Sequence, residues 1–214
     1  YSKAVKSSGS GSRIAVVYAD GAIVGGKGED GQIGSDTYRS MLSKLRTDSK
    51  VKAVVLRINS PGGSAIASEI IWRELELLKK EKPLVVSMGD YAASGGYYIA
   101  CNADSIFAMP NTLTGSIGVF TILIDAQKMF NDKLGINFDG VSTNTYSDFG
   151  NITRPMSAFE KQVAQRDVDS IYATFKNRVI KGRRLAGNLV DSIAQGRIWS
   201  GTDGLQIGLV DRIG

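Results

Sequence analysis

Histidine is absent from the 214-residue sequence, and this absence excludes several kinds of catalytic site. A Ser-His-Asp triad and a Cys-His dyad both need an imidazole, so this chain alone can build neither. Zinc sites with histidine ligands are excluded for the same reason, and we expect no metal and no cofactor. If the chain is a hydrolase, its base must be Lys, Asp, Glu or Tyr.

Cysteine and long apolar runs are also scarce. Cys101 is the single cysteine, so no intrachain disulfide can form, and its apolar neighbours indicate a small core residue. The apolar runs have the length of strands and fall short of the roughly 20 residues that a membrane span requires. The sequence opens at Tyr1 with neither an initiator Met nor a signal peptide, from which we expect a piece of a longer protein.

The net charge of +5 is not gathered into one basic segment. Lys and Arg are interspersed with acidic residues and no nucleic-acid-binding motif is present, so we expect no nucleic-acid partner. The hydrophobic share of 43% and the charged share of 22% are those of an ordinary globular protein. The length allows a core without disulfides.

The order of the predicted elements indicates an α/β fold. Residues 1–12 are rich in Ser, Gly and Lys and predict a flexible linker, and residues 13–214 predict one folded domain. Strands are predicted at 13–18, 51–58, 84–88 and 105–108, with a glycine-rich loop at 21–34 and helices at 35–47, 65–80 and 92–101. Strands that alternate with helices through short connections predict a mostly parallel sheet. Ser35 or Asp36 is the expected N-cap of the first helix.

The pattern loosens after Thr112. Two further strands are predicted at 115–124 and 137–141, and a helix at 126–134. A polar loop at 143–155 leads to a long amphipathic helix at 157–181 and a second helix at 185–195. The last sixteen residues, 199–214, predict a short strand, a helical turn and a final strand.

The first informative site is the loop Asn59–Ser64, which lies between a buried strand and a long helix. Gly62 and Gly63 leave their backbone N–H groups free of side-chain cover and allow positive φ angles. Such a loop can bind a phosphate or stabilise an oxyanion. Neither a Walker pattern nor GxGxxG is present, so the nucleotide interpretation is weak. A tight turn without chemistry fits the local spacing equally well.

The second site is the segment Ala92–Tyr98, which follows the strand at 84–88. Ser94 is flanked by small residues at the start of a helix, as in a nucleophile elbow, although the pattern is not GxSxG. From this segment alone, an N-capping role for Ser94 is the stronger interpretation. Consecutive strand-to-helix loops of a parallel sheet emerge at the same edge, so the Gly62–Gly63 loop could face Ser94 and Gly95. Tyr97 and Tyr98 could line a substrate groove, but packing of the helix on the sheet is favoured for at least one.

Three motifs in register carry a resemblance to a known family: Asn59-Ser-Pro-Gly-Gly-Ser64, Ala92-Ala-Ser-Gly-Gly-Tyr-Tyr98 and Thr112-Leu-Thr-Gly-Ser-Ile-Gly118. Together with the tail at 196–211, they resemble the signal peptide peptidase A (protease IV) family of serine–lysine peptidases over nearly the whole chain. The resemblance implies a Clp protease/crotonase-like fold of repeated β-β-α units with a helical carboxy-terminal part. It also implies ring-like homo-oligomers at the bacterial inner membrane, with the catalytic domain on the extracytoplasmic side.

The resemblance also assigns roles to individual residues. Ser94 is the implied nucleophile, and Gly62, Gly63 and Gly95 are the implied oxyanion-hole donors. Ser116 is implied to orient the general-base lysine by a hydrogen bond; without the resemblance, a turn serine before a strand would be favoured. The implied substrates are hydrophobic peptides such as released signal peptides.

The base itself is where this sequence departs from the single-domain members of the family, whose lysine lies roughly fifty residues after the nucleophile. That neighbourhood, residues 142–150, contains no lysine here. Lys128, Lys133 and Lys161 are the nearest, and they are better explained as solvated helix residues. Long members are tandem duplications whose amino-terminal half supplies the lysine, and this chain resembles the carboxy-terminal half. We therefore expect the isolated chain to be inactive or nearly so.

Two other interpretations stay open at this point. A crotonase-like enzyme acting on acyl-CoA would use the same oxyanion loop without a nucleophile. A non-catalytic assembly module would need the glycine loops only for structure, and the helix at 157–181 could then contact other subunits.

Overall fold

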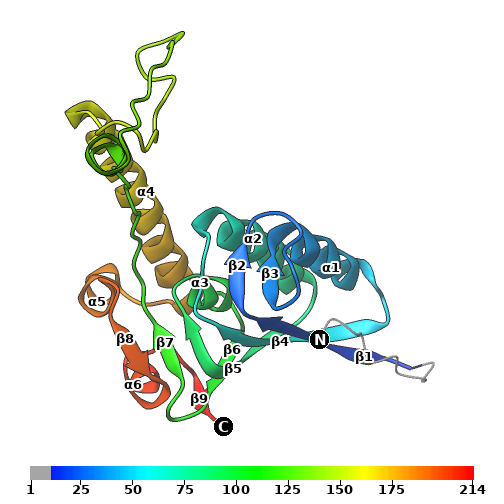
Figure 1. The fold of residues 1–214 in the computed structure, drawn as a ribbon. Coiled ribbons are helices and arrows are strands. Elements are labelled where there is room, and N and C mark those ends of the chain that lie inside the picture. Colours follow the sequence, from blue (N-terminus) through cyan, green and yellow to red (C-terminus); the bar gives the residue numbers. More distant parts are fainter. Residues whose placement is uncertain (1–10) are drawn as a thin grey trace. The chain divides into compact units, whose positions relative to one another are not determined.

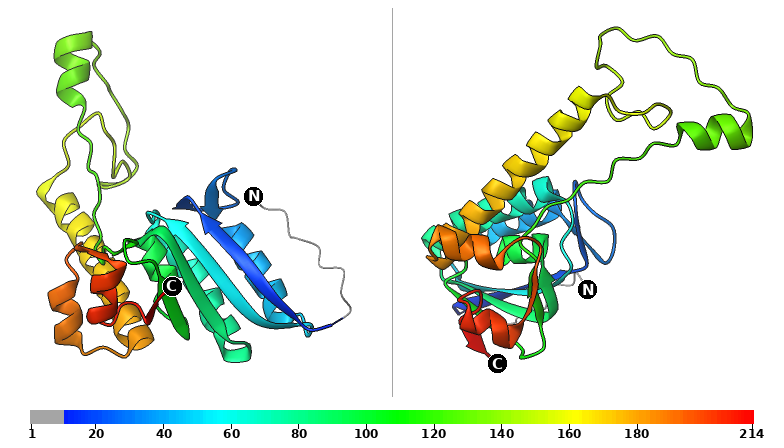
Figure 2. Two further views of the ribbon diagram at one scale, coloured as in Figure 1. Left: turned by 90° about the horizontal axis from the view of Figure 1, so that it is seen from below. Right: turned by 90° about the vertical axis from the view of Figure 1, so that its left-hand side faces the viewer.

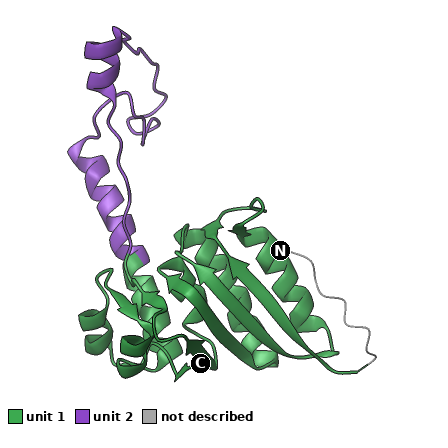
Figure 3. Cartoon of the chain, turned by 60° about the horizontal axis from the view of Figure 1, so that its bottom comes forward, with its two compact units in different colours: residues 1–118, 172–214 green, residues 119–171 purple. Residues whose placement is uncertain are grey.

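A computed structural model describes residues 11–214 of the chain, and the predicted linker at 1–12 therefore lies almost entirely outside the described residues. The chain divides into two compact units (Figure 3). Unit 1 comprises residues 1–118 and 172–214, and unit 2 comprises residues 119–171.

A sheet of seven strands forms the centre of unit 1 in the described residues, and every pairing except that of β7 with β8 is parallel (Figure 1). The strands are β1 (Arg13–Asp20), β4 (Val51–Ser60), β5 (Leu84–Ala93), β6 (Ser105–Ala108), β7 (Leu113–Gly115), β8 (Ile198–Ser200) and β9 (Arg212–Ile213). Their order is β1-β4-β5-β6-β9, with β7 pairing with both β5 and β8. The predicted α/β class with a mostly parallel sheet is confirmed.

Helices cover one face of this sheet. Figure 2 shows α1 (Ser35–Thr47) and α2 (Ala65–Glu81) along the strands β1, β4 and β5, and the short α3 (Gly95–Ala100) follows β5. Alternate residues of β4, such as Leu56 and Ile58, are fully buried beneath the helices. On the opposite face, Val16 and Tyr18 of β1 are exposed. The hydrophobic core therefore lies between the sheet and one layer of helices.

Local sequence explains where α2 begins and what it buries. The Ser64 side chain accepts a hydrogen bond from the N–H of Ala67, which satisfies one of the N–H groups that a helix start leaves open. Ile71, Leu75 and Leu78 recur at helical spacing and are all fully buried. The helix ends at Glu81, and Lys82 and Pro83 follow. This end is expected because proline disfavours helical backbone in the residue before it.

Two expectations for the amino-terminal part are wrong. The segment 21–34 is not simply a loop, because β2 (Ala22–Val24) and β3 (Gln32–Gly34) pair in parallel within it. The N-cap of α1 is Gly34 rather than Ser35 or Asp36, and Ser35 is the buried first residue of the helix. A Cβ at residue 34 would lie 1.9 Å from the Lys27 carbonyl oxygen. The backbones of residues 27 and 34 therefore pack so closely that glycine is required at this N-cap position.

The carboxy-terminal part of unit 1 follows the predicted order. Helix α4 (Ala158–Arg183) contributes its last turns to this unit, where Phe175 and Val179 are buried in the core. Helix α5 (Gly187–Ile193), β8, α6 (Gly201–Gln206) and β9 follow in turn. Within residues 11–214, none of the helices combines the length and the apolar character that crossing a membrane requires.

Unit 2 consists of a π-helical segment η1 (Met129–Lys133), the first turns of α4 and long irregular connections. The helix predicted at 126–134 is therefore present, but the strands predicted at 115–124 and 137–141 are wrong. Strand β7 ends at Gly115, and residues 119–124 have no strand beside them. An apolar pattern of strand type forms no strand without a partner for its backbone hydrogen bonds.

Burial in unit 2 differs from that of an ordinary folded unit. More than half of the exposed large apolar side chains in the described chain lie between Phe120 and Phe159. Glu160 is the one buried residue among 119–171. Two ring contacts, Phe130 with Phe138 and Tyr146 with Phe159, are formed inside this unit.

A charged cluster fixes the irregular chain before α4. The Arg154 guanidinium donates to both carboxylate oxygens of Asp148, at 2.6 and 2.7 Å, and to both of Glu160, at 2.9 and 2.6 Å. Glu160 also accepts the N–H of Ser157, whose hydroxyl accepts the N–H of Glu160, which is a capping box. The hydrogen bonds from Arg154 and the Ser157 N–H lower the pKa of Glu160 to about 2. Hydrogen bonds from Arg154 likewise lower the pKa of Asp148.

Candidate active site

Ser94 occupies the sharp turn between strand β5 and helix α3. Its backbone has φ 52° and ψ −121°, a combination that side-chain-bearing residues rarely adopt. Strained backbone of this kind persists only where the surrounding structure imposes it, and it recurs at functional sites. A strand-to-helix turn that forces a serine into such a conformation is the geometry of a nucleophile elbow.

The Ser94 side chain is not used to hold the fold together. Ser94 is the N-cap residue of α3 by position, but its side chain forms no capping hydrogen bond, so capping does not explain the hydroxyl. No other residue that the structure describes hydrogen-bonds to its hydroxyl, and the residue is partly exposed. The hydroxyl is therefore free to react with a molecule from outside.

The Gly62–Gly63 loop packs directly against this turn. A Cβ on Gly62 would lie 2.5 Å from the backbone N of Gly95 and 2.9 Å from Ser94 Cβ. A Cβ on Gly95 would lie 3.2 Å from the Gly63 N. The structure thus brings the two glycine loops of the sequence together, and only residues without a side chain permit this approach.

The three N–H groups that the sequence nominates as oxyanion donors differ in their partners. The Gly62 N–H donates to Ser60 Oγ at 3.1 Å and is engaged inside the fold. The N–H groups of Gly63 and Gly95 have no acceptor in the part of the chain that the structure describes. Two unpaired N–H donors beside a serine hydroxyl are what an acyl-transfer site requires.

Ser116 lies next to Ser94 through strand pairing. β5 pairs with β7 so that Ala93 is opposite Gly115, and the Ser94 N–H donates to the Gly115 carbonyl at 3.0 Å. The Ser116 N–H donates to the Arg197 carbonyl at 2.8 Å. Its backbone also has a positive φ, 48°, and its hydroxyl has no partner among the described residues. Both serines follow directly on the last paired residues of neighbouring strands.

The residues after Ser94 are structural. The Tyr97 hydroxyl donates to the Leu209 carbonyl at 2.9 Å, and Tyr98 packs on Phe175 with ring centroids 4.7 Å apart. Both tyrosines are buried, which confirms the packing interpretation and excludes a groove-lining role. Cys101 is fully buried as predicted, and burial raises the pKa of its thiol to about 12.

No lysine of the described chain hydrogen-bonds to Ser94 or Ser116. Lys128, Lys133 and Lys161 are exposed residues of unit 2, as their helical positions predicted. In unit 1, Lys82 donates to the carbonyls of Leu45 and Asp48 and serves the fold. The described residues therefore contain a serine with donors around it but no bonded base.

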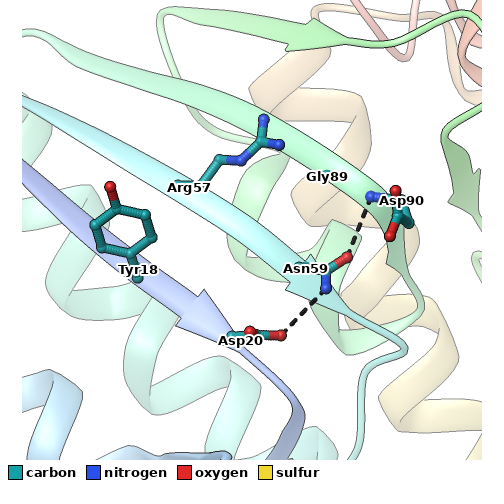
Figure 4. A pocket seen from close by; sticks show the side chains of 6 residues that line it. All are labelled: Tyr18, Asp20, Arg57, Asn59, Gly89 and Asp90. Atoms are coloured by element: carbon teal, nitrogen blue, oxygen red, sulfur yellow. Dashed lines mark hydrogen bonds between the residues drawn. The ribbon is translucent and has the colours of Figure 1, made fainter. Parts of the chain in front are cut away.

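A hollow that the sequence did not predict lies on the uncovered face of the sheet, at the carboxyl ends of β1, β4 and β5 (Figure 4). It encloses about 220 Å³ and is lined by Tyr18, Asp20, Arg57, Asn59, Gly89 and Asp90. The Asn59 amide donates to Asp20 at 3.2 Å and accepts the N–H of Asp90 at 3.1 Å. The Asn59 side chain therefore links the ends of three strands by hydrogen bonds.

In residues 11–214, no group of three or more Cys, Asp and Glu side chains could hold a metal ion.

Comparison of the sequence with protein-family models shows similarity to known peptidases. A family model described as peptidase family S49 matches residues 76–214, and one described as Clp protease matches residues 13–114.

Two curated relatives are similar over 94% of the chain. Protease 4 of Haemophilus influenzae is 45% identical over 203 residues, and the chloroplastic serine protease SPPA of Arabidopsis thaliana is 37% identical over 207 residues. The matched region makes up 33% and 30% of those two proteins, so the chain spans about a third of their length.

Among solved structures, a ClpP1 variant from Listeria monocytogenes has a TM-score of 0.62 and covers 93% of this chain, which covers 90% of that one. Sequence identity is 15%, so this likeness shows the fold alone and confirms the expected Clp protease-like architecture.

Proposed function

Because this chain belongs to peptidase family S49, the signal peptide peptidase A (protease IV) family, we propose that it is the nucleophile-bearing part of a serine peptidase. The observation that carries the proposal is the conformation of Ser94. Its unbonded hydroxyl is presented on a strained strand-to-helix turn, beside the unpaired N–H groups of Gly63 and Gly95.

In the proposed reaction, Ser94 Oγ attacks the carbonyl carbon of a peptide bond while a base takes the hydroxyl proton. The N–H groups of Gly63 and Gly95 donate to the oxyanion of the tetrahedral intermediate, and Gly62 closes the loop beside them. The proton passes to the leaving amine, which departs as the C–N bond breaks and leaves an acyl-enzyme. Attack by water then forms the acid product and frees Ser94.

The base is proposed to be a lysine supplied by another part of the parent protein, its amino-terminal half. A lysine serves at neutral pH only if burial or nearby positive charge lowers its pKa. Lys128, Lys133 and Lys161 of unit 2 are exposed and therefore lack this burial. Ser116 is proposed to orient the lysine through a hydrogen bond, which its unbonded hydroxyl beside Ser94 supports.

The proposed substrates are hydrophobic peptides such as released signal peptides, cleaved on the extracytoplasmic side of a bacterial inner membrane. Family membership supports this assignment. The parent protein is further proposed to form homo-oligomers. The exposed apolar side chains of unit 2 support a protein contact there, since exposed apolar patches of this extent mark interaction surfaces.

The experiment that tests the proposal compares peptidase activity of the full-length parent, its Ser94→Ala variant and the present chain alone, on a peptide ester. We expect the parent to be active and the variant to lose at least about 1,000-fold in kcat, because no other residue can form the acyl-enzyme. The fold should survive, since the Ser94 hydroxyl bonds to nothing in the described chain.

The three proteins separate the alternatives. An active parent with an inactive chain supports a base from outside, and mixing the chain with the missing half should restore cleavage. Full activity of the isolated chain would mean that the base lies within these residues. An active Ser94→Ala variant would reject Ser94 as the nucleophile. A parent without any peptidase activity would instead favour the acyl-CoA interpretation.

A further inference from the structure

The buried Ser60 side chain joins two segments behind the proposed oxyanion site. Ser60 is the last residue of β4 and has no exposed surface. Its hydroxyl donates to the Gly21 carbonyl at 2.7 Å, in the turn after β1, and accepts the Gly62 N–H at 3.1 Å. The residue thus connects the first strand of the sheet with the loop that faces Ser94.

The orientation of the peptide between Gly62 and Gly63 follows from its other contacts. The N–H of Ile23, in β2, donates to the Gly62 carbonyl at 2.9 Å. This peptide is trans, so the Gly63 N–H points away from that carbonyl and therefore away from β2. The Gly63 nitrogen lies close to Gly95, on the side of the nucleophile.

The glycine backbone cannot maintain this orientation by itself. Gly62 has φ 100° and Gly63 has φ 151°, and glycine moves between such conformations with little cost. Hydrogen bonds must therefore restrain the peptide. The Gly62 carbonyl of this peptide is held by the Ile23 N–H. The Ser60 hydroxyl holds the N–H of the preceding Pro61–Gly62 peptide, so the two bonds fix the backbone on both sides of the Gly62 Cα.

We propose that Ser60 is a positioning residue, whose hydroxyl holds Gly62 so that the Gly63 N–H faces the carbonyl under attack by Ser94. This inference rests on the proposed peptidase function. Ser60 lies behind the loop and acts only through it, so its loss should lower kcat and leave KM nearly unchanged.

The test uses the full-length parent with two variants of equal shape, Ser60→Thr and Ser60→Val. Threonine keeps the hydroxyl and valine replaces it with a methyl group, so any strain from the added carbon is common to both. We expect kcat of Ser60→Val to fall about 10- to 100-fold. Without the Ser60 hydroxyl, the Gly63 N–H is no longer held in place and stabilises the oxyanion less. Ser60→Thr should recover most of that loss, with KM within about 2-fold throughout.

A transition-state mimic supplies a second readout. A peptide aldehyde forms a hemiacetal with the nucleophile, and its oxygen occupies the oxyanion site. Its inhibition constant should rise in Ser60→Val by about the factor that kcat falls. A variant that merely lowered the folded fraction would change the active-site concentration but not this constant.

Thr112→Val is the matched control. The Thr112 hydroxyl is equally buried, donates to the Gly89 carbonyl at 2.7 Å and accepts the Met109 N–H at 3.0 Å, away from the Gly62–Gly63 loop. Its removal should destabilise the protein much as Ser60→Val does, with kcat within about 2-fold of the wild type.

Three results would overturn the proposal: wild-type kcat in Ser60→Val, equal losses in Ser60→Thr and Ser60→Val, or an equal kcat loss in Thr112→Val. Failure of the proposed peptidase function is recognised separately, because the parent itself would then cleave no peptide substrate or Ser94→Ala would cleave it as fast as the parent. In that event a crystal structure of Ser60→Ala still decides. A rotated Gly62–Gly63 peptide in that structure would support the proposal that the Ser60 hydroxyl fixes its orientation, and an unchanged peptide would reject it.

Discussion

The two units of this chain use apolar residues in opposite ways. Unit 1 buries them between a parallel sheet and its helices, with Leu56, Ile71 and Leu84 fully enclosed. Unit 2 contains as obvious an apolar pattern, yet its one buried residue is the charged Glu160. Apolar content therefore does not reveal whether a segment has its own core. Unit 1 should be stable by itself, whereas unit 2 needs a surface beyond its own residues.

Separating the units should have the largest effect. A peptide of residues 119–171 is expected to show no cooperative unfolding, because it has no buried apolar core to offset its conformational entropy. Unit 1 with residues 119–171 replaced by a short Gly-Ser linker should still unfold cooperatively, as followed by circular dichroism. The replacement is geometrically reasonable, since Gly118 packs on Gly196 and the Tyr172 hydroxyl accepts the N–H of neighbouring Gln195. A stable isolated peptide would refute the comparison.

Matched truncations in the two units should differ in stability. Leu56→Ala is expected to cost about 2–5 kcal/mol, because it leaves a cavity in a fully buried site. Ile122→Ala, at a side chain that is 74% exposed, should stay within about 0.5 kcal/mol. Urea unfolding of the dilute chain measures both values. Equal costs would mean that unit 2 has a core after all.

Self-association should depend on unit 2. The triple variant Phe120→Ser, Ile122→Ser and Ile124→Ser removes exposed apolar side chains without touching the core. We expect the proposed assembly of the parent protein to be lost, or to be at least about 10-fold weaker, because the variant removes apolar area from the proposed contact. Sedimentation velocity measures the change. Exchanging exposed Ile14 of unit 1 for Ser is the control, and an unchanged assembly in the triple variant would place the contact elsewhere.

Acid should loosen unit 2 at its charged cluster. In the fold, Arg154 holds the pKa of Glu160 at about 2, below the ordinary value of 4.5. The stabilisation is therefore complete above about pH 4.5 and is lost as the pH falls towards 2. Asp148, also lowered by Arg154, contributes with the same sign. Carboxyl NMR shifts should give a Glu160 midpoint near 2 that rises towards 4.5 in Arg154→Gln, and an unchanged midpoint would contradict the cluster.

The regular elements of unit 1 were predictable because each has a burial pattern that its partners satisfy. Helix α1 has the predicted bounds, and so does β6. The strand expected at 115–124 failed for a reason outside the segment itself, because pairing depends on residues distant in sequence. The short pair β2 and β3 was missed because three residues carry too little periodicity to recognise.

For the candidate site, the sequence supplied the residue types but not their geometry. Motif spacing brought Ser94 and the Gly62–Gly63 loop to one sheet edge, where the structure has them in contact. Nothing in the sequence shows that the Gly62 N–H is engaged while that of Gly63 is open. The role of Ser60 was missed because one buried serine resembles any other until its hydrogen bonds are known.

The close contact of the glycine loops limits what can vary at this site. A Cβ at Gly62, Gly63 or Gly95 would come within 2.6 Å of another atom, so a random library at these positions should return glycine alone. Substitution cannot then tune the oxyanion contacts by side-chain chemistry. Diversification, natural or engineered, is left to neighbouring positions with exposed side chains, such as Ile66, Tyr91 and Leu113. Catalysis and selectivity would thereby evolve on separate sets of residues.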